Sequence, residues 1–160
     1  MELPEPSDLS EPSDRTAVGS LQQALSALSY AMSGNQTHAR LRREAGVTVD
    51  RASLAVLRVL SAAPSPLLLR ELAEALMVKA PHVTREVRRL EELGLVETTR
   101  EPGDQRARRV APTKDGREAV ARTEATGRQW LAEALNGFSA SDVRTTAAVI
   151  DRIVDAYRQP

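Results

Sequence analysis

The sequence contains no cysteine, and this absence excludes three kinds of chemistry. Without thiols the chain cannot form disulfides, bind a metal through thiolates or sense oxidants through a cysteine. Histidine is also scarce, because only His38 and His82 are present. They fall on different predicted helices, and no HExxH, P-loop or Rossmann glycine motif accompanies them. We therefore expect no enzyme, no metal site and no cofactor.

Long apolar runs are missing as well. Runs such as Leu67–Leu69 are only a few residues long, and the N-terminal residues are acidic rather than basic. A membrane-spanning helix needs about 20 apolar residues, and a secretory signal begins with a basic segment before an apolar one. We therefore expect no membrane span and no signal peptide, and a cytoplasmic location.

The bulk composition is that of an ordinary globular chain, although its charge is unevenly distributed. The 160 residues are 41% hydrophobic and 28% charged, which predicts one fold unit with a real core. Net charge is zero, but residues 1–15 hold five acidic side chains against Arg15, so the rest of the chain carries a charge of +4. Residues 1–16 repeat Glu-Pro-Ser-Asp and offer little to bury. We expect them to form a disordered acidic tail.

Apolar spacing and breaker residues predict a mainly α fold with a small β-hairpin. The hairpin combines strands at 95–100 and 108–111 with a turn at 101–104. Thr113 and Ser139 stand where they can cap the last two helices. The predicted helices run from Val18 toward Leu41, over 50–62, 68–77 and 81–93, from Thr113 to Leu135, and onward from Ser139.

Two short helices joined by a tight turn and followed by a hairpin are typical of a winged helix-turn-helix, whose second helix enters a DNA major groove. On that helix Val83, Val87 and Leu90 share one apolar stripe. Arginine on the opposite face can bind guanine through two hydrogen bonds or hold a phosphate. The alternative is a solvated charged face. The cations in this segment are Lys79, Arg85, Arg88 and Arg89, and His82 flanks them.

The segment from Leu72 to Val96 resembles the MarR (multiple antibiotic resistance regulator) family. The hairpin adds Asp104-x-Arg106, Val110, Thr113 and Gly116, which match the family's wing signature except that Pro112 stands in place of leucine. Lysine at position 79 departs from the small polar residue common in the family, and it cannot cap the helix. The resemblance implies a winged helix-turn-helix lobe at 47–112 within a unit at 17–160, flanked by dimerisation helices at 17–46 and 113–160.

By that resemblance the recognition helix and the wing contact double-stranded DNA. Arg106 would enter the minor groove, with its guanidinium held by Asp104; a surface salt bridge that stabilises the turn is the alternative. Arg108 and Arg109 are expected at phosphates, because neighbours on a strand point to opposite faces. The full set of DNA-binding residues expected is Lys79, His82, Thr84, Arg85, Arg88, Arg89, Asp104, Arg106, Arg108 and Arg109.

The resemblance also implies a homodimer that regulates transcription by binding a pseudo-palindromic operator, with repression as the commoner outcome. A small-molecule effector is left open, and polar contacts for one could come from Tyr30, His38, Ser53 and Arg128, each of which could equally be a packed or surface residue. The competing interpretations are a winged helix that binds proteins and an architectural protein that binds DNA without sequence preference.

Overall fold

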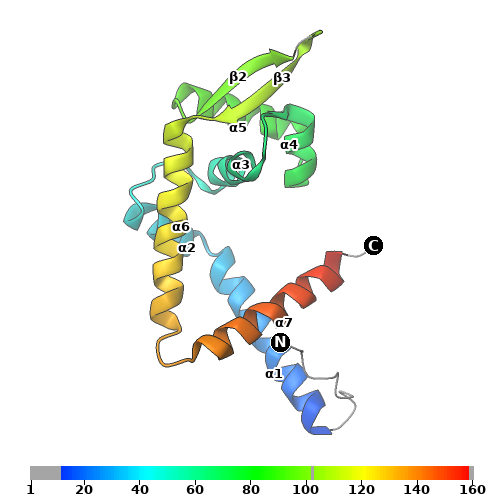
Figure 1. The fold of residues 1–160 in the computed structure, drawn as a ribbon, viewed down its shortest axis with the longest axis vertical. Helices are drawn as coiled ribbons and strands as arrows, with labels where there is room; N and C mark the ends of the chain where they lie inside the picture. Colours follow the sequence, from blue (N-terminus) through cyan, green and yellow to red (C-terminus); the bar gives the residue numbers. More distant parts are fainter. Residues whose placement is uncertain (1–11, 102, 159–160) are drawn as a thin grey trace.

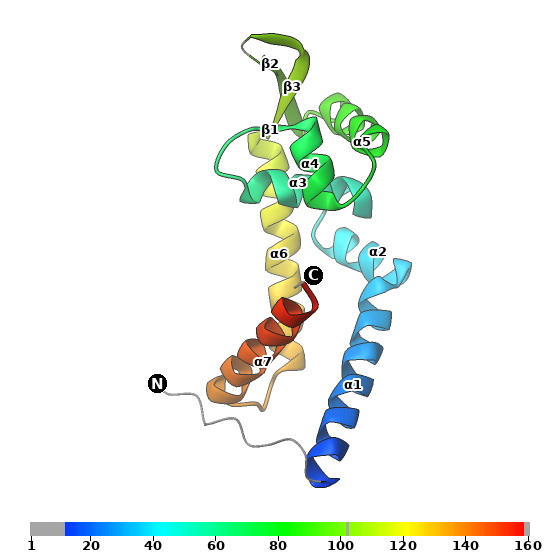
Figure 2. The ribbon, with the colours of Figure 1, turned by 90° about the vertical axis from the view of Figure 1, so that its right-hand side faces the viewer.

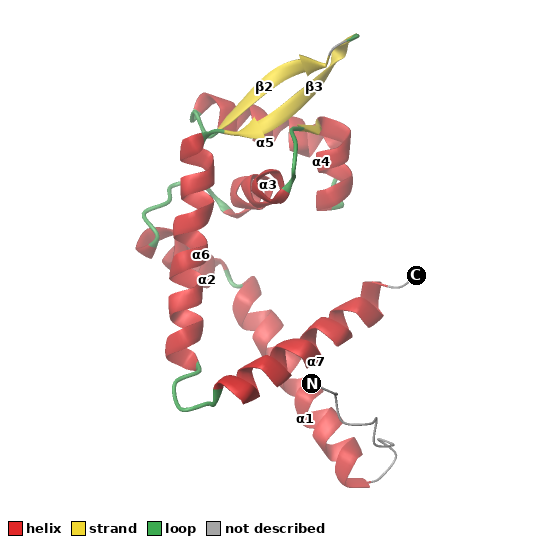
Figure 3. Cartoon of the chain, in the orientation of Figure 1, coloured by secondary structure: helices red, strands yellow, loops and turns green. Residues whose placement is uncertain are grey.

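The computed structural model describes residues 12–101 and 103–158, of which 12–14, 101, 104–106 and 158 are described by their backbone alone. As the sequence predicts, these residues form a mainly helical fold with a small antiparallel sheet (Figures 1 and 3). The elements are α1 (Pro12–Ser33), α2 (Asn35–Glu44), α3 (Arg51–Ala62), β1 (Leu67–Leu68), α4 (Leu69–Leu76), α5 (Ala80–Glu92), β2 (Val96–Glu101), β3 (Asp104–Pro112), α6 (Lys114–Ala134) and α7 (Ala140–Arg158).

A winged helix-turn-helix lobe is built from α3, α4, α5 and the sheet. The sheet has the strand order β1-β3-β2, and both strand pairs are antiparallel. The hairpin β2–β3 is the predicted one, whereas β1 was not predicted. Two residues are too few to show the alternation that marks a strand, and β1 is defined only by its pairing, in which Leu67 faces Val110.

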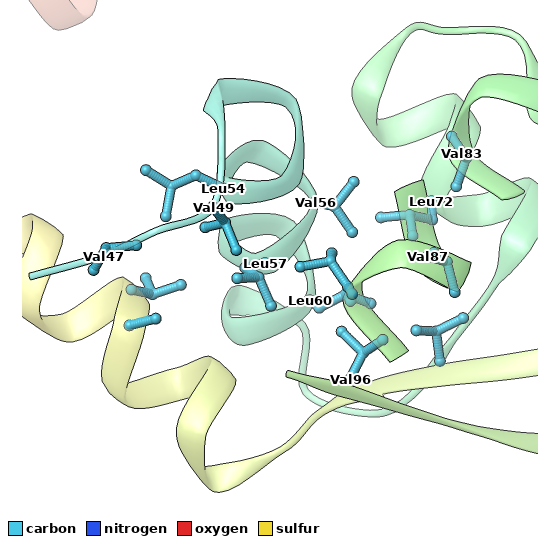
Figure 4. Close-up of a cluster of buried hydrophobic side chains, with 14 of the residues drawn as sticks. Val47, Val49, Leu54, Val56, Leu57, Leu60, Leu72, Val83, Val87 and Val96 are labelled. Atoms are coloured by element: carbon cyan, nitrogen blue, oxygen red, sulfur yellow. The ribbon is translucent and has the colours of Figure 1, made fainter. Parts of the chain in front are cut away.

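The core of this lobe lies between α3 and the elements around it (Figure 4). Leu57 of α3, Leu72 of α4, Leu90 of α5 and Val110 of β3 are fully buried. Burial of four such side chains from four elements stabilises their packing by a few kcal/mol each, on the order of 1.5–3 for a Leu or Val. The core therefore fixes α5 against α3 and the hairpin.

The junction between the hairpin and α6 is tight. Thr113 caps α6, since its hydroxyl accepts the Gly116 N–H at 3.2 Å, and the same hydroxyl donates to the Gly94 carbonyl at 2.7 Å. At Gly116 an added Cβ would lie 2.1 Å from the Leu95 carbonyl oxygen, a distance that no side chain tolerates. Two residues of the wing signature thus have a structural role at the base of the hairpin.

Two boundaries differ from the predictions. The first long helix does not continue toward Leu41, because Gly34 is extended (φ −65°, ψ 132°) and α2 starts after it. Glycine has a high entropic cost in a helix, and the Thr37 hydroxyl donates to the Ala31 carbonyl across the break. The predicted tail is also shorter, since residues 12–16 are helical. Proline suits the first helical position, where its missing N–H costs nothing. Residues 1–11 lie outside the described part of the chain.

Helices α1 and α7, called the arms here, lie apart from the winged lobe, and α7 begins at the end of α6 that is far from it (Figure 2). Among the described residues, α1 packs extensively only on α2, and α7 packs extensively on no other element. Helix α2 is held to α6 by Trp130, whose Nε1 donates to the Glu44 carboxylate at 2.7 Å while the Arg40 guanidinium lies 4.5 Å from the ring centre. The arms leave large apolar side chains exposed, namely Val18, Leu21, Leu28, Tyr30, Met32, Val149, Val154 and Tyr157.

Candidate nucleic-acid interface

Helix α5 is anchored by one apolar stripe, which leaves its other side to solvent. Val83, Val87 and Leu90 are buried at spacings of four and three, as predicted. The helix begins after Lys79, whose side chain makes no capping hydrogen bond, as expected for a residue without an acceptor. Pro81 in the first turn compensates in part, because its fixed φ suits a helix start. The opposite side of the helix is therefore presented rigidly.

The exposed side of α5 carries the predicted cations. Arg85 and Arg88 are exposed and line one shallow depression together with Thr84. The Thr84 hydroxyl donates to the Ala80 carbonyl within the helix at 3.0 Å, so its oxygen still faces outward as an acceptor. Lys79 and His82, in the turn and the first helical turn, are exposed as well.

A second hollow, of about 270 Å³, connects this face with the hairpin. Its lining includes Thr84 and Arg88 from α5 and Thr98 and Arg108 from the two strands. The Thr98 hydroxyl donates to the Glu91 carboxylate at 2.5 Å and ties the strand to the helix. The hollow thus brings Arg88 of the helix and Arg108 of the hairpin to one surface, with the Glu91 carboxylate in the same lining.

The register of the hairpin reveals a cation that the sequence analysis missed. Arg100 of β2 pairs directly with Arg108 of β3, and both are exposed. Like charges opposite each other on a sheet are destabilising. A bound anion would relieve the repulsion between the two guanidinium groups, so this pair indicates an anion-binding surface. The sequence did place Arg100 at the end of a predicted strand. It did not show which residue of the other strand would lie opposite Arg100.

Two of the predicted DNA-binding arginines are occupied elsewhere in the structure. Arg89 forms an ion pair with Asp50 at the start of α3. Arg109 donates to the Pro66 carbonyl at 2.9 Å, which braces the loop before β1. The structure therefore does not bring these two side chains together with Arg85 and Arg88. Asp104 and Arg106 lie in β3 at the hairpin end, and their side chains fall outside the described residues.

Asp50 links α3 to α5 electrostatically. Its carboxylate accepts the Ser53 N–H at 2.9 Å and so caps α3, while its other oxygen meets Arg89. The backbone hydrogen bond from Ser53 and the Arg89 guanidinium lower the pKa of Asp50, against the opposing effect of burial. The pair is therefore ionised at neutral pH.

The four residues expected at an effector site do not gather. Tyr30 and Arg128 are exposed on α1 and α6, and Arg128 lies 3.8 Å from Glu124. Ser53 is fully buried between α3 and α5. His38 alone offers a free atom, because its Nε2 is buried without a hydrogen-bond partner. Burial, followed by the charges of Arg51, Arg58 and Arg42, lowers its pKa, whereas a hydrogen bond to the Met32 carbonyl raises it.

Within the described ranges, no three His, Asp or Glu side chains are grouped as metal ligands would be. Nor does any helix there have the length and hydropathy needed to cross a bilayer.

Comparison with known proteins identifies the fold, and one family model matches part of the chain. The model of the MarR family matches residues 46–107. Solved structures that resemble the chain include a MarR family protein from Bacillus stearothermophilus (TM-score 0.76, 16% identity, covering 91% of this chain and 98% of that one) and the YusO protein from Bacillus subtilis (0.68, 23%, 89% and 97%). FabT from Streptococcus pneumoniae, solved in complex with DNA, is also similar (0.71, 17%, 88% and 96%). No curated protein sequence matches. At these identities the structures establish the fold alone.

Proposed function

We propose that this chain is a member of the MarR family, whose model matches residues 46–107, and that it is a sequence-specific DNA-binding regulator of transcription. In this proposal α5 enters a major groove and the hairpin reaches the flanking backbone. The observation that carries it is the placement of exposed arginines on both elements: Arg85 and Arg88 on α5, and the Arg100–Arg108 pair on the hairpin, where Arg108 shares a hollow with Arg88. A winged helix that binds proteins would be expected to present apolar anchors there instead.

The proposal includes a homodimer, which the arms support. Their apolar side chains are left exposed by the residues that the structure describes, and a second copy related by two-fold symmetry would bury the same surface twice. Two recognition helices would then meet half-sites about 34–36 Å apart, so the operator is an inverted repeat. The division into a winged lobe at 47–112 and dimerisation helices at 17–46 and 113–160 belongs to this proposal.

The experiment that tests DNA recognition is selection of bound sequences from a random duplex pool, followed by a mobility-shift titration. An inverted repeat with centres about one helical turn apart is expected. Arg85→Ala and Arg106→Ala should each lower operator affinity roughly tenfold, on the order expected for one lost base contact, while Arg122→Ala on α6 should not. Binding without an enriched motif would favour the architectural alternative, and no binding at low salt would end the proposal.

Repression is the proposed outcome, because a dimer that covers a promoter excludes polymerase from it. Transcription in vitro from a template that carries the selected operator should fall as protein is added. A rise would reverse the sign of regulation without affecting the DNA-binding proposal. Such a regulator works in the compartment that holds the DNA, which places it in the cytoplasm of a bacterium.

We further propose that an effector, if one controls release, binds beside His38. The support is the buried Nε2 without a partner and the three arginines close enough to affect the pKa of the imidazole. These charges favour an anion such as an aromatic carboxylate. Benzoate should raise the melting temperature of the wild type and change operator affinity, since a ligand shifts a conformation only through unequal affinity for its states. Equal responses in the wild type and in His38→Ala would contradict this site.

A further inference from the structure

Glu86 is a carboxylate in an unexpected place on the recognition helix. It follows Val83 by three residues and precedes Leu90 by four, so it shares the side of α5 that faces the core. Its side chain is only 14% exposed, against 72% for the neighbouring Arg85. Its spacing from Val83 and Leu90 places this carboxylate beside the apolar stripe.

The carboxylate of Glu86 is held between a buried hydroxyl and an exposed cation. The Ser53 hydroxyl, on a residue with no exposed surface, donates to Glu86 Oε2 at 3.0 Å. The other oxygen, Oε1, lies 3.7 Å from Arg85 Nε. Glu86 therefore bridges the interior of the lobe to an arginine on its exposed face.

The support itself is rigid, because Ser53 is in the first turn of α3 beside the capping residue Asp50. Asp50 accepts the Ser53 N–H and also pairs with Arg89, one turn along α5 from Arg85. Two polar ties thus join the start of α3 to α5. Together they fix how far α5 is rotated about its own axis relative to α3.

Stability alone does not explain a carboxylate at this position. Burying a charged group is costly, and replacement of a buried polar pair by apolar residues of similar size is often neutral or stabilising. A leucine would complete the apolar stripe of Val83, Val87 and Leu90. What leucine could not do is hold the Arg85 guanidinium, whose long side chain otherwise samples many rotamers.

We propose that Glu86 is a positioning residue that determines sequence specificity by holding Arg85 in place for base recognition, with Ser53 as its support. This inference rests on the DNA-binding function proposed above. Arg85 contacts the base and Glu86 does not; Glu86 acts through Arg85 by reducing the number of conformations that must be lost on binding.

The test compares operator affinity with affinity for random duplex DNA in the full-length protein. In Ser53→Ala/Glu86→Leu both polar partners are removed, so the urea midpoint should equal or exceed that of the wild type. Preference for the operator should nevertheless fall on the order of tenfold, with random-duplex affinity unchanged. Glu86→Gln keeps an acceptor for Ser53 but loses the charge, and should lower the preference several-fold. Glu92→Gln, at an exposed position on the same helix, is the matched control.

A double-mutant cycle separates positioning from a merely structural role. If Glu86 acts through Arg85, Arg85→Ala/Glu86→Gln should bind the operator no more weakly than Arg85→Ala. Additive losses, or equal losses on operator and random DNA, would overturn the inference. If the Leu variant does not unfold cooperatively, the Gln variant and the cycle decide. A wild type that prefers no sequence would instead refute the proposed function itself.

Discussion

The winged lobe and the two arms are built from similar helices but solve the burial of apolar side chains differently. In the lobe Leu57, Leu72 and Leu90 have no exposed surface, and six helices and strands contribute to a single core. In the arms Leu28 and Tyr30 of α1 are 49% and 86% exposed, and Tyr157 of α7 is 88% exposed. The amphipathic pattern is present in both regions, but only the lobe is completed within one chain.

The difference shows which part of the fold buries its apolar side chains within a single chain. A helix with an apolar stripe is stable in water only if the stripe is covered. The lobe covers its own stripes, so its geometry depends on one chain. The arms leave theirs open, so their arrangement depends on what covers them. Mutations in the two regions should therefore differ in magnitude and in their dependence on protein concentration.

The largest effect is expected in the lobe. Leu57→Ala leaves a cavity at a fully buried site and should lower the free energy of unfolding by about 3 kcal/mol. The matched change in the arm, Leu28→Ala, removes the same atoms from a half-exposed site and should cost about 1 kcal/mol or less in the isolated chain. Urea unfolding at two protein concentrations measures both. Equal costs, independent of concentration, would remove the distinction between lobe and arm.

The next effect concerns the arms alone. Leu21→Glu/Val154→Glu places charges on the exposed apolar faces of α1 and α7, and should raise the dimer dissociation constant at least about thirtyfold. Sedimentation should show monomers, while near-wild-type helical content shows that the lobe remains folded. Gln22→Glu, next to Leu21, adds a charge at an exposed polar position as control. Unchanged dimers in the double variant would mean that these faces are not the interface.

A smaller effect is expected where arm and lobe meet, at His38. Its pKa in the folded chain is below the ordinary value of 6.5, chiefly through burial. As pH falls through 6.5, His38 takes up its proton in the unfolded state before it does so in the folded state. The free energy of unfolding therefore decreases from about pH 6.5 down to the pKa of His38 in the folded chain. Urea unfolding at pH 7.5 and 5.5 should show a smaller loss for His38→Gln than for the wild type. An identical loss would show that His38 does not contribute.

The smallest effect is a gain within the lobe. Met77 ends α4 in the left-handed conformation (φ 53°), and its side chain is 92% exposed. Residues other than glycine are strained there by roughly 1 kcal/mol, while glycine costs more entropy in the unfolded chain. Met77→Gly should therefore stabilise the lobe by a few tenths of a kcal/mol, measured as a rise in the urea midpoint. A fall would mean that the methionine side chain contributes packing.

Much of the fold was predictable because local signals are strong in this chain. Spacing alone located α3 to α7 to within about two residues, and the Thr113 cap and the Ser139–Asp142 capping box are present as expected. The sequence did not predict those elements whose existence or end depends on more than local spacing. β1 is defined by its pairing with β3, and the helix break at Gly34 competes with a pattern that continues beyond it.

The candidate site was predictable to the level of a face, and less so for single residues. Helical periodicity placed Arg85 and Arg88 on the exposed side of α5. It could not show that Arg89 would meet Asp50, 39 positions away, or that Arg109 would meet Pro66, 43 positions away. Strand alternation gives a side chain's face but not its partner, which is why the Arg100–Arg108 pair was found only from the register.

The tight junction at Gly116 gives α6 a mechanical consequence. Thr113 and Gly116 hold the start of α6 against the base of the hairpin, and α6 runs without a break from Lys114 to Ala134, with five residues between its end and α7, so it acts as one rod of 21 residues. At 1.5 Å per residue its length is about 32 Å. A tilt of about 10° at one end therefore moves the other by roughly 5 Å, which exceeds the 3.4 Å rise of one base pair. A small rotation of α6 at the end near the arms therefore displaces the wing by more than the rise of one base pair.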